Sequence, residues 1–535
     1  MKIPAWFVPL TPRKAATTVL FVVGAVWLVI RFCGLGVSPP GFFMDEAAPA
    51  VHAMCLAETG KDADGTAWPL YSSAAGGGHH PLTLIAFDIP WMKIFGTSRE
   101  AFRAVSAFWI LVTAFGLFFI ARELLALMPS QPQPQPQPSD GPGDEARRVF
   151  PWMVLLAALL SPWGFQFSRV GWESPLAPAY LILSILALMR SHRGGRWAIV
   201  WSVFAGFCAA ASMVSYPPLR AAVPVVFLLV GALLLAVTRE WSAKWTYLKQ
   251  ILSAGIVTWA CFAPTLRMLM DSKINDRMNN VAIWNERWMR ENIADLGRWR
   301  FLFKAFLDHM ALHLRPSFLF IDGDASLRHN PHLTGPLSPL DILALAFVLW
   351  MVVLWVARLV RGASPMPKVP GLILEPSSRW LVAIAALSIL FGLIGLAPSA
   401  LTYEAVPHAM RAIGAWPFVA LFTGAVLTLA WAHRRWIPAL LTGVAIAYSL
   451  YFLPAYFHAY DKAVNHWFMR EMTDVLDKES HDDPPKTAAN TISEHLYYSY
   501  SYDEVPRYYL MTEAHMKCVE AADALRSYKA GERAK

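Results

Sequence analysis

Charged residues are scarce in this chain of 535 residues. Asp, Glu, Lys and Arg make up 16% of the sequence, whereas hydrophobic residues make up 56%, and the mean hydropathy is +0.39. Soluble globular domains carry about 25% charged residues, so this composition excludes an ordinary soluble domain. Basic runs interleaved with aromatic residues are also missing, and the net charge of +8 therefore gives no indication of a nucleic-acid partner. The composition predicts a membrane protein.

Cysteine is scarce as well, with five residues in the whole chain. No two of them have the spacing of metal ligands, so the sequence gives no sign of a cysteine-bound metal. Cys208 and Cys261 fall in apolar segments, while Cys33, Cys55 and Cys518 fall outside them. A disulfide between Cys55 and Cys518 is one alternative, but three cysteines leave one unpaired, and the sequence does not indicate which one.

Long apolar windows, by contrast, recur along the chain. Each holds about 17–22 residues, enough to cross a hydrocarbon core. The first window is longer than the apolar core of a signal peptide, and no small-residue cleavage site follows it, so we expect a retained helix. The predicted fold class is an all-α polytopic membrane protein with about eleven transmembrane helices. The windows lie at residues 14–31, 101–121, 150–167, 174–189, 197–215, 220–238, 250–270, 338–357, 380–398, 412–431 and 436–455.

Lys and Arg gather in every second loop between these windows. Short basic loops stay in the cytoplasm, so the alternation predicts a protein of the cytoplasmic (inner) membrane with its N-terminus inside. The QPQPQPQP tract at 131–138 falls in a cytoplasmic loop and is typical of an extended spacer. The opposite loops, above all 32–98 and 271–337, hold much of the remaining polar sequence, and we expect surface helices and the functional site there.

We expect two regions. Residues 1–455 form the membrane module, and residues 456–535 form a small extracytoplasmic C-terminal domain. Within this tail, TISEHLYYSYSY has the alternation of a strand and TEAHMKCVEAADALRSY the pattern of a helix, which together predict a mixed α/β tail.

Two adjacent carboxylates, Asp45 and Glu46, follow the first window in the stretch GVSPPGFFMDEAAPAVHAM. A carboxylate held at the membrane surface can act as a general base for a hydroxyl group, a step worth roughly 10²- to 10⁴-fold in rate. In the first turn of a helix, the same acids would simply favour the helix dipole. Position alone does not choose between the two interpretations.

The acidic pair belongs to a longer pattern. MDEAAPAVHAMCLAETGKDADGTAWPL and HHPLTLIAFDIPWMKIFGTSREAFRAVSA resemble the first outer loop of GT-C glycosyltransferases of family 39 type, which include protein O-mannosyltransferases and lipid A aminoarabinose transferases. FSRVGWESPLAP, VSYPPLRAAVP, FLFIDGDASLRHNPHLTGPLSPLD and PHAMRAIGAWP resemble further stretches of bacterial members, in the same order. The resemblance covers most of residues 1–450.

This resemblance implies an inverting transferase that moves a sugar from a polyprenyl-phosphate donor to an acceptor on the extracytoplasmic face. The acceptor could be an envelope glycan, a glycolipid or a protein, and the sequence indicates neither it nor the sugar. Asp45 matches the catalytic aspartate of the family and would accept the proton of the acceptor. Glu46 beside it would raise the pKa of its neighbour if both were partly buried.

The chain departs from the family at GGGHHPL. Some relatives carry an acidic or Glu-Lys pair before this proline, whereas His79 and His80 stand here. These histidines could hold a divalent metal near Asp45, or they could be polar surface residues of a glycine-rich loop. No metal ligand is assigned.

The departing polyprenyl phosphate gains charge in the transition state, which favours fixed guanidinium groups around it. For each outer-side arginine the alternative is contact with lipid headgroups or a purely topological role. The candidates for the donor phosphate are Arg103, Arg169, Arg220, Arg328 and Arg411. The candidates for other substrate contacts are His79, His80, Glu173, Tyr216, His329 and His408.

Two other classes of membrane protein stay open. A transporter or lipid flippase usually places ionisable residues and broken helices near the membrane midplane, and the windows here hold almost no charges. A polysaccharide polymerase or ligase would share the topology, but would not be expected to keep the Asp-Glu pair after the first window.

Overall fold

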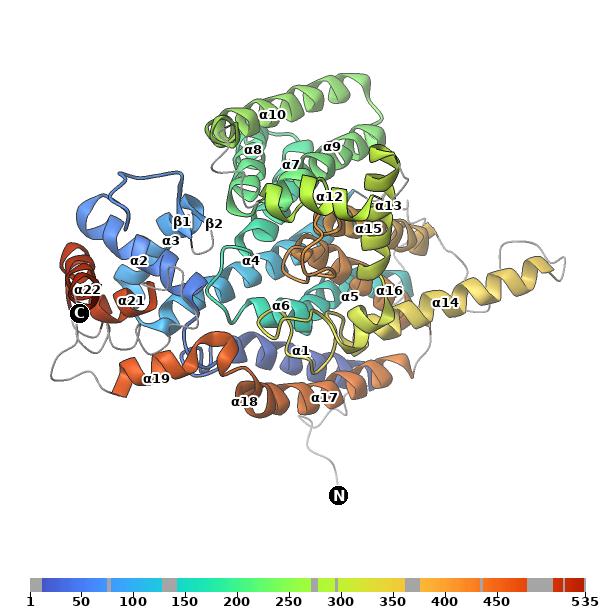
Figure 1. The fold of residues 1–535 in the computed structure, drawn as a ribbon. Helices are drawn as coiled ribbons and strands as arrows, with labels where there is room; N and C mark the ends of the chain where they lie inside the picture. The colour runs from blue at the N-terminus through green and yellow to red at the C-terminus, as the bar shows by residue number, and fades with distance from the viewer. Residues whose placement is uncertain are drawn as a thin grey trace.

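The computed structural model describes residues 12–74, 78–127, 142–270, 278–293, 297–360, 376–433, 436–478, 504–512 and 515–533, and these residues are mostly helical (Figure 1). Each predicted window overlaps a helix, but the window at 150–167 is interrupted, because one helix ends at Leu159 and a separate short helix begins at Pro162. The eleven helices are α1 (Pro12–Ile30), α4 (Arg99–Ala126), α5 (Pro142–Leu159), α7 (Leu176–His192), α8 (Ala198–Ser215), α9 (Leu219–Val237), α10 (Trp241–Leu269), α14 (Pro339–Val360), α15 (Pro376–Ala400), α16 (Trp416–His433) and α17 (Ile437–Ala455).

The multi-pass character predicted from the sequence is confirmed. Within the described part of the chain, nine helices are long and apolar enough to cross a membrane, and α7 is a shorter apolar helix. Large apolar side chains on α10 and α14 point outward: Ile256, Trp259 and Leu349 are each more than 60% exposed. Such faces are unfavourable in water but match a lipid environment.

Helix α16 lies at the centre of the helical bundle and packs against α5, α14 and α15. Its contact with α5 is close because Gly424 has no side chain. A Cβ atom at this position would lie 2.5 Å from a side-chain carbon of Val154 and 2.7 Å from its backbone nitrogen. Small residues at helix contacts let backbones approach in this way in membrane proteins.

The first outer loop carries the predicted surface helices, α2 (Met44–Thr59) and α3 (Leu82–Phe95). Between them lies an antiparallel hairpin of β1 (Tyr71–Ala74) and β2 (Gly78–Pro81), which the sequence analysis did not predict. Helix α2 ends at Gly60, whose φ of 71° favours glycine. Figure 1 shows this loop at one side of the bundle, beside the C-terminal helices.

The second long outer loop is also helical, with α12 (Glu286–Asn292), α13 (Arg298–His313) and a π-helical turn, η2 (Ser317–Ile321). Helix α13 packs against α15, and its side chains Trp299, Phe303 and Leu307 are exposed. A helix with this exposed apolar row suits the membrane interface.

The described part of the C-terminal tail is helical. The predicted strand at 491–502 lies outside the described residues, whereas the predicted helix is present as α22. The elements are η4 (Tyr456–Tyr460), α18 (Asp461–Ala463), η5 (His466–Phe468), α19 (Arg470–Lys478), α21 (Glu504–Thr512) and α22 (Cys518–Arg533).

Candidate active site

The two adjacent acids at the start of α2 lie in different surroundings. Glu46 is buried and accepts four hydrogen bonds: two from Arg103 (both 2.8 Å), one from the Gly171 amide (2.8 Å) and one from the Phe43 amide (3.1 Å). Asp45 is half-buried in the first turn, where the helix dipole favours a carboxylate. Glu46 therefore acts as a structural anchor, and Asp45 is the acid of the pair that stays partly accessible.

Arg103 is fully buried, and its hydrogen bonds account for all five of its N–H donors. Besides the two donated to Glu46, it donates to the backbone oxygens of Leu35 (2.8 Å), Pro39 (2.6 Å) and Gly41 (2.9 Å). A guanidinium has five donors and no acceptor. Arg103 thus holds the loop before α2 in place. Because all its donors are used there, we no longer assign Arg103 to the donor phosphate.

Arg169 is also bound mainly to backbone oxygens, although its buried Nε has no hydrogen-bond partner. It is buried and donates to the backbone oxygens of Ser38 (2.6 Å) and Cys33 (2.9 Å), among others. Arg31, which the sequence analysis did not single out, is buried nearby and donates to the oxygen of Gly164 (2.7 Å). These arginines tie the segment after α1 to the segment around α6 (Pro162–Phe167), so Arg169 is also dropped as a phosphate ligand.

Arg328 lies close to the start of α2. Its guanidinium carbon is 4.1 Å from the ring centroid of Phe43 and 5.8 Å from that of Trp467, as in cation–π contacts. The side-chain amide of Gln166 donates to its backbone oxygen (2.7 Å). Phe43 is two residues before Asp45, so these contacts place Arg328 near the start of α2.

A second polar group surrounds the hairpin. His80 is buried, its Nδ1 lies 3.7 Å from Glu173, and neither of its ring nitrogens has a hydrogen bond. Burial, followed by the neighbouring His80 and Arg220, lowers the pKa of His79. Arg220 donates to the hydroxyl of Tyr71 (3.1 Å). The structure therefore brings four predicted site residues together here: His79, His80, Glu173 and Arg220.

The remaining predicted residues are held by their own segments. Arg411 donates to Thr402 (3.1 Å) and to the carboxylate of Glu404 (3.1 Å) in the same loop. Tyr216 is buried at the end of α8.

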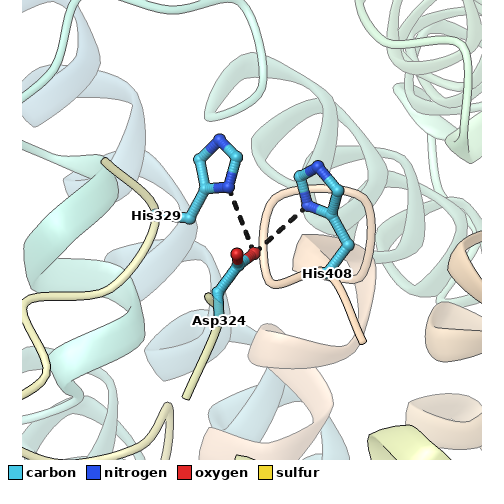
Figure 2. A group of neighbouring side chains, drawn as sticks. All are labelled: Asp324, His329 and His408. Atoms are coloured by element: carbon cyan, nitrogen blue, oxygen red, sulfur yellow. Dashed lines mark hydrogen bonds and ion pairs between the residues drawn. The ribbon is translucent and has the colours of Figure 1, made fainter. Parts of the chain in front are cut away.

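Asp324, His329 and His408 form a third group, which draws on two separate loops (Figure 2). The Nδ1 atoms of His329 and His408 lie 3.1 Å and 3.3 Å from the same Asp324 oxygen. The two rings stack with centroids 4.5 Å apart, and Phe167 and Trp172 flank His329. Burial alone would raise the pKa of Asp324, but His329 and then His408 hold it well below its usual value.

Two groups of the described residues could hold a divalent metal, because their donor atoms lie within 4.8 Å of one another. Neither contains Asp45, His79 or His80, where the sequence suggested a metal. A group able to hold an ion is thus present, but at other residues. The groups are Asp324, His329 and His408, and His52, Asp62 and Asp64.

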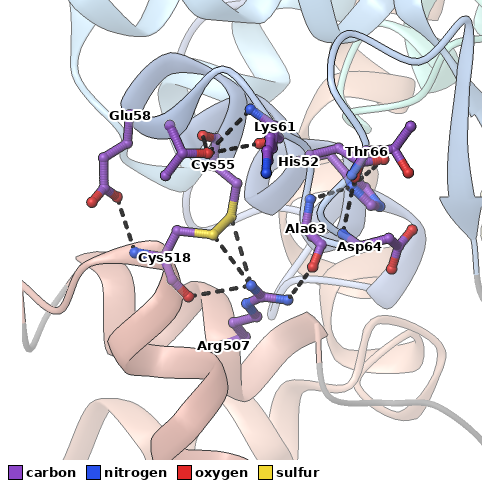
Figure 3. Close-up of a disulfide and its surroundings, with 11 residues drawn as sticks. His52, Cys55, Glu58, Lys61, Ala63, Asp64, Thr66, Arg507 and Cys518 are labelled. Atoms are coloured by element: carbon purple, nitrogen blue, oxygen red, sulfur yellow. Dashed lines mark hydrogen bonds and ion pairs between the residues drawn. A yellow bond between two sulfur atoms is a disulfide. The ribbon is translucent and has the colours of Figure 1, made fainter.

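The far end of α2 is bound to the C-terminal helices (Figure 3). Cys55 and Cys518 form a disulfide, which answers the pairing left open by the sequence, and Cys33 is free and exposed. Arg507 donates to the backbone oxygens of Cys518 (3.2 Å) and Ala63 (3.3 Å). Helices α21 and α22 therefore fix α2 from the end opposite to Asp45.

No family model and no curated protein matches the chain. Among solved structures, ArnT from Cupriavidus metallidurans bound to undecaprenyl phosphate is similar, with 12% identity, a TM-score of 0.41, and coverage of 95% of this chain and 78% of that one. The oligosaccharyltransferase AglB from Archaeoglobus fulgidus, in complex with an inhibitory peptide and a dolichol-phosphate, is similar with 11% identity, a TM-score of 0.38, and coverage of 92% of this chain and 60% of that one. The arabinofuranosyltransferase AftD from Mycobacteria is similar with 13% identity, a TM-score of 0.34, and coverage of 89% of this chain and 28% of that one.

These proteins are of the kind that the sequence resembles, membrane glycosyltransferases of GT-C type. The alignments run over most of this chain, but all TM-scores are below 0.5. They are likenesses only and carry no argument about the activity of this chain.

Proposed function

We propose that this chain is an integral membrane glycosyltransferase that moves a sugar from a polyprenyl-phosphate donor to an acceptor on the extracytoplasmic face, with inversion at the anomeric carbon. The observation that carries this proposal is the contrast between the two acids of α2. Glu46 is saturated by four hydrogen bonds, whereas Asp45 is half-buried on a helix start that Glu46 and Arg103 hold rigid. A rigidly placed, partly accessible carboxylate is what a general base requires.

In the proposed reaction, Asp45 accepts the proton of the acceptor hydroxyl as the new glycosidic bond forms. The bond between the anomeric carbon and the phosphate oxygen breaks, and the polyprenyl phosphate leaves with the electron pair. Fixed cations stabilise this leaving group. Arg328 and Arg220 are the cations we assign to this role, because Arg328 lies over Phe43 near the start of α2 and Arg220 lies beside His79 and Tyr71 of the hairpin.

His79, His80 and Glu173 are assigned to substrate contacts beside Arg220. The unpaired ring nitrogens of His80 support this role, because a buried imidazole without partners costs free energy that a substrate hydroxyl would recover. Tyr216, His329 and His408 stay proposed substrate contacts on the strength of the family resemblance.

For the orientation, we propose that α2, the hairpin and the C-terminal region from residue 456 lie outside the cytoplasm, with residues 1–455 as the membrane module and the N-terminus inside. The Cys55–Cys518 disulfide supports this, because disulfides persist in oxidising compartments. The acceptor is then an envelope glycan, a glycolipid or a protein at the outer face of the cytoplasmic membrane.

The test is turnover of a lipid-linked sugar. Purified protein in lipid nanodiscs is incubated with a panel of undecaprenyl-phosphate sugars and an extract of envelope acceptors, and mass spectrometry follows release of free undecaprenyl phosphate. Release that depends on Asp45 supports the proposal. Movement of the intact lipid between leaflets without release would indicate a flippase, and use of diphosphate-linked oligosaccharides alone would indicate a polymerase or ligase.

A further inference from the structure

In the group formed by Asp324, His329 and His408, one buried polar atom has no hydrogen-bond partner. One carboxylate oxygen of Asp324 accepts from the amide of Ala409 (2.7 Å) and from Nδ1 of His329 (3.1 Å), and the other accepts from the amide of Ser326 (2.8 Å). Nδ1 of His408 lies 3.3 Å from the first of these oxygens, is buried and has no hydrogen bond. Leaving a buried nitrogen unpaired is costly.

The geometry sharpens this conflict. Nδ1 of His408 approaches the carboxylate without making a hydrogen bond, so a lone pair facing the Asp324 oxygen would be repelled by it. A cation held between Nδ1 and the Asp324 oxygen converts this repulsion into two attractive contacts.

The spacing of the donor atoms matches such an ion. Bonds of about 2.0–2.1 Å at tetrahedral angles place neighbouring ligand atoms about 3.3 Å apart. The separations from the Asp324 oxygen to the two Nδ1 atoms are 3.1 and 3.3 Å, and all three donors lie within 4.8 Å of one another. Two imidazoles and one carboxylate form a ligand set that zinc prefers to magnesium or calcium.

From this geometry we propose that Asp324, His329 and His408 bind a divalent transition-metal ion of the zinc type, with a fourth coordination position open to water or another ligand. Binding uses the Nδ1 lone pair of His329, so a neutral His329 binds as the tautomer with its proton on Nε2, a protonated one releases one proton to solvent, and no other co-reactant is needed. The amides of Ala409 and Ser326 hold the carboxylate in place, and His332 donates to the backbone oxygen of Asp324 (2.6 Å). Such outer contacts orient metal ligands.

The other candidate group fits an ion poorly. Nε2 of His52 donates to the oxygen of Ser73 (2.9 Å), and its Nδ1 accepts from the amide of Ala63 (3.2 Å), so both ring nitrogens are already used. Asp62 caps a turn by accepting from two backbone amides, including that of Asp64 (3.0 Å). These contacts stabilise a loop without an ion, and His52 therefore provides a matched control.

The ion would link two segments that are far apart in sequence. Asp324 and His329 lie between η2 and α14, and His408 lies between α15 and η3 (Ile413–Ala415). Because Arg328 is next to His329, the ion would also fix this arginine over Phe43. The proposal does not depend on the transferase activity, since it is tested by metal content.

The experiment measures zinc in detergent-purified full-length protein made with an affinity tag that contains no histidine. After incubation with zinc and dialysis against metal-free buffer, elemental analysis should find about one zinc per chain in the unmodified protein. His329→Ala and His408→Ala should each reduce retained zinc by at least about tenfold, whereas His52→Ala should retain it. All variants are checked by size-exclusion chromatography.

The proposal is overturned if the unmodified protein retains no zinc, if both His329→Ala and His408→Ala retain it, or if only His52→Ala loses it. Should the two ligand variants fail to fold, X-ray absorption at the zinc edge of the unmodified protein decides. A shell of two imidazoles with oxygen supports the site, and a shell with sulfur or with oxygen alone overturns it.

Discussion

Arg103 donates two hydrogen bonds to the carboxylate of Glu46, each 2.8 Å long, and both side chains are fully buried. The pair joins α4 to the first turn of α2, and the remaining donors of Arg103 fix the loop before α2. The residue next to Glu46 is Asp45, so the pair determines where the proposed base points. The sequence suggested Glu46 as a catalytic acid and Arg103 as a phosphate ligand; the two pair with each other instead, and we propose that the pair supports the proposed site.

Breaking this pair should destabilise the protein strongly. Removing one partner of a buried pair leaves an uncompensated charge and typically costs about 3–5 kcal/mol. We therefore expect Arg103→Ala to lower the unfolding temperature of the purified protein markedly. Arg290→Ala is the matched control, because Arg290 pairs with Glu286 in an exposed position where such pairs contribute at most about 0.5 kcal/mol. Equal unfolding temperatures for the two variants would contradict the structural role.

Asp45→Asn should abolish turnover while leaving the fold intact. Asparagine keeps the size of the side chain and serves the start of a helix about as well as aspartate, but it cannot accept the proton. Turnover of an undecaprenyl-phosphate sugar by folded protein should fall by roughly 10²-fold or more. Asp308→Asn, at an exposed position of α13, is the control. Activity close to that of the unmodified protein would show that Asp45 is structural.

Arg328→Ala and Arg220→Ala should weaken use of the donor more than Arg411→Ala. The first two lie near Phe43 and the hairpin, whereas Arg411 is already paired with Glu404. Lysine at position 328 should restore activity only partly, because it cannot form a bidentate contact with phosphate. The measurement is kcat/KM for the donor, with exposed Arg287→Ala as control. Unchanged kinetics in both variants would place the leaving-group site elsewhere.

The disulfide gives a prediction that does not depend on activity. Non-reducing digestion and mass spectrometry should recover a Cys55–Cys518 linked peptide, while exposed Cys33 is alkylated without reduction. Cys518→Ser should lower the unfolding temperature, because removal of a native disulfide typically costs about 2–5 kcal/mol. Recovery of both cysteines as free thiols from freshly isolated membranes would argue against the bridge.

Reporter fusions test the orientation directly. Fusions at residue 65 and after residue 460 should report an extracytoplasmic location, and fusions within 131–138 and 362–370 a cytoplasmic one. A cytoplasmic signal at residue 65 would put Asp45 on the side opposite to the proposed acceptor, and the transferase proposal would then have to be withdrawn.

The sequence by itself determined where the helices run. Each of the eleven apolar windows overlaps a helix, because the cost of placing a polar backbone and charged side chains in lipid acts on each window separately. One interpretation of the sequence placed Asp45 and Glu46 in the first turn of a helix, and they do lie in the first turn of α2, since a helix start after a proline pair is a local signal. The hairpin was missed, because its strands are only four residues each and carry little alternation.

Only the tertiary structure decided what each polar side chain does. Arg103 and Arg328 are equivalent as outer-side arginines in the sequence, yet one is consumed by Glu46 and backbone oxygens, and the other packs over Phe43. Asp324 meets His408 across segments separated by two long helices, and Cys55 meets Cys518 across almost the whole chain. Hydrogen bonds, ion pairs and metal ligands need atoms within about 3–4 Å, and the folding of distant segments sets these distances, because no local pattern encodes them.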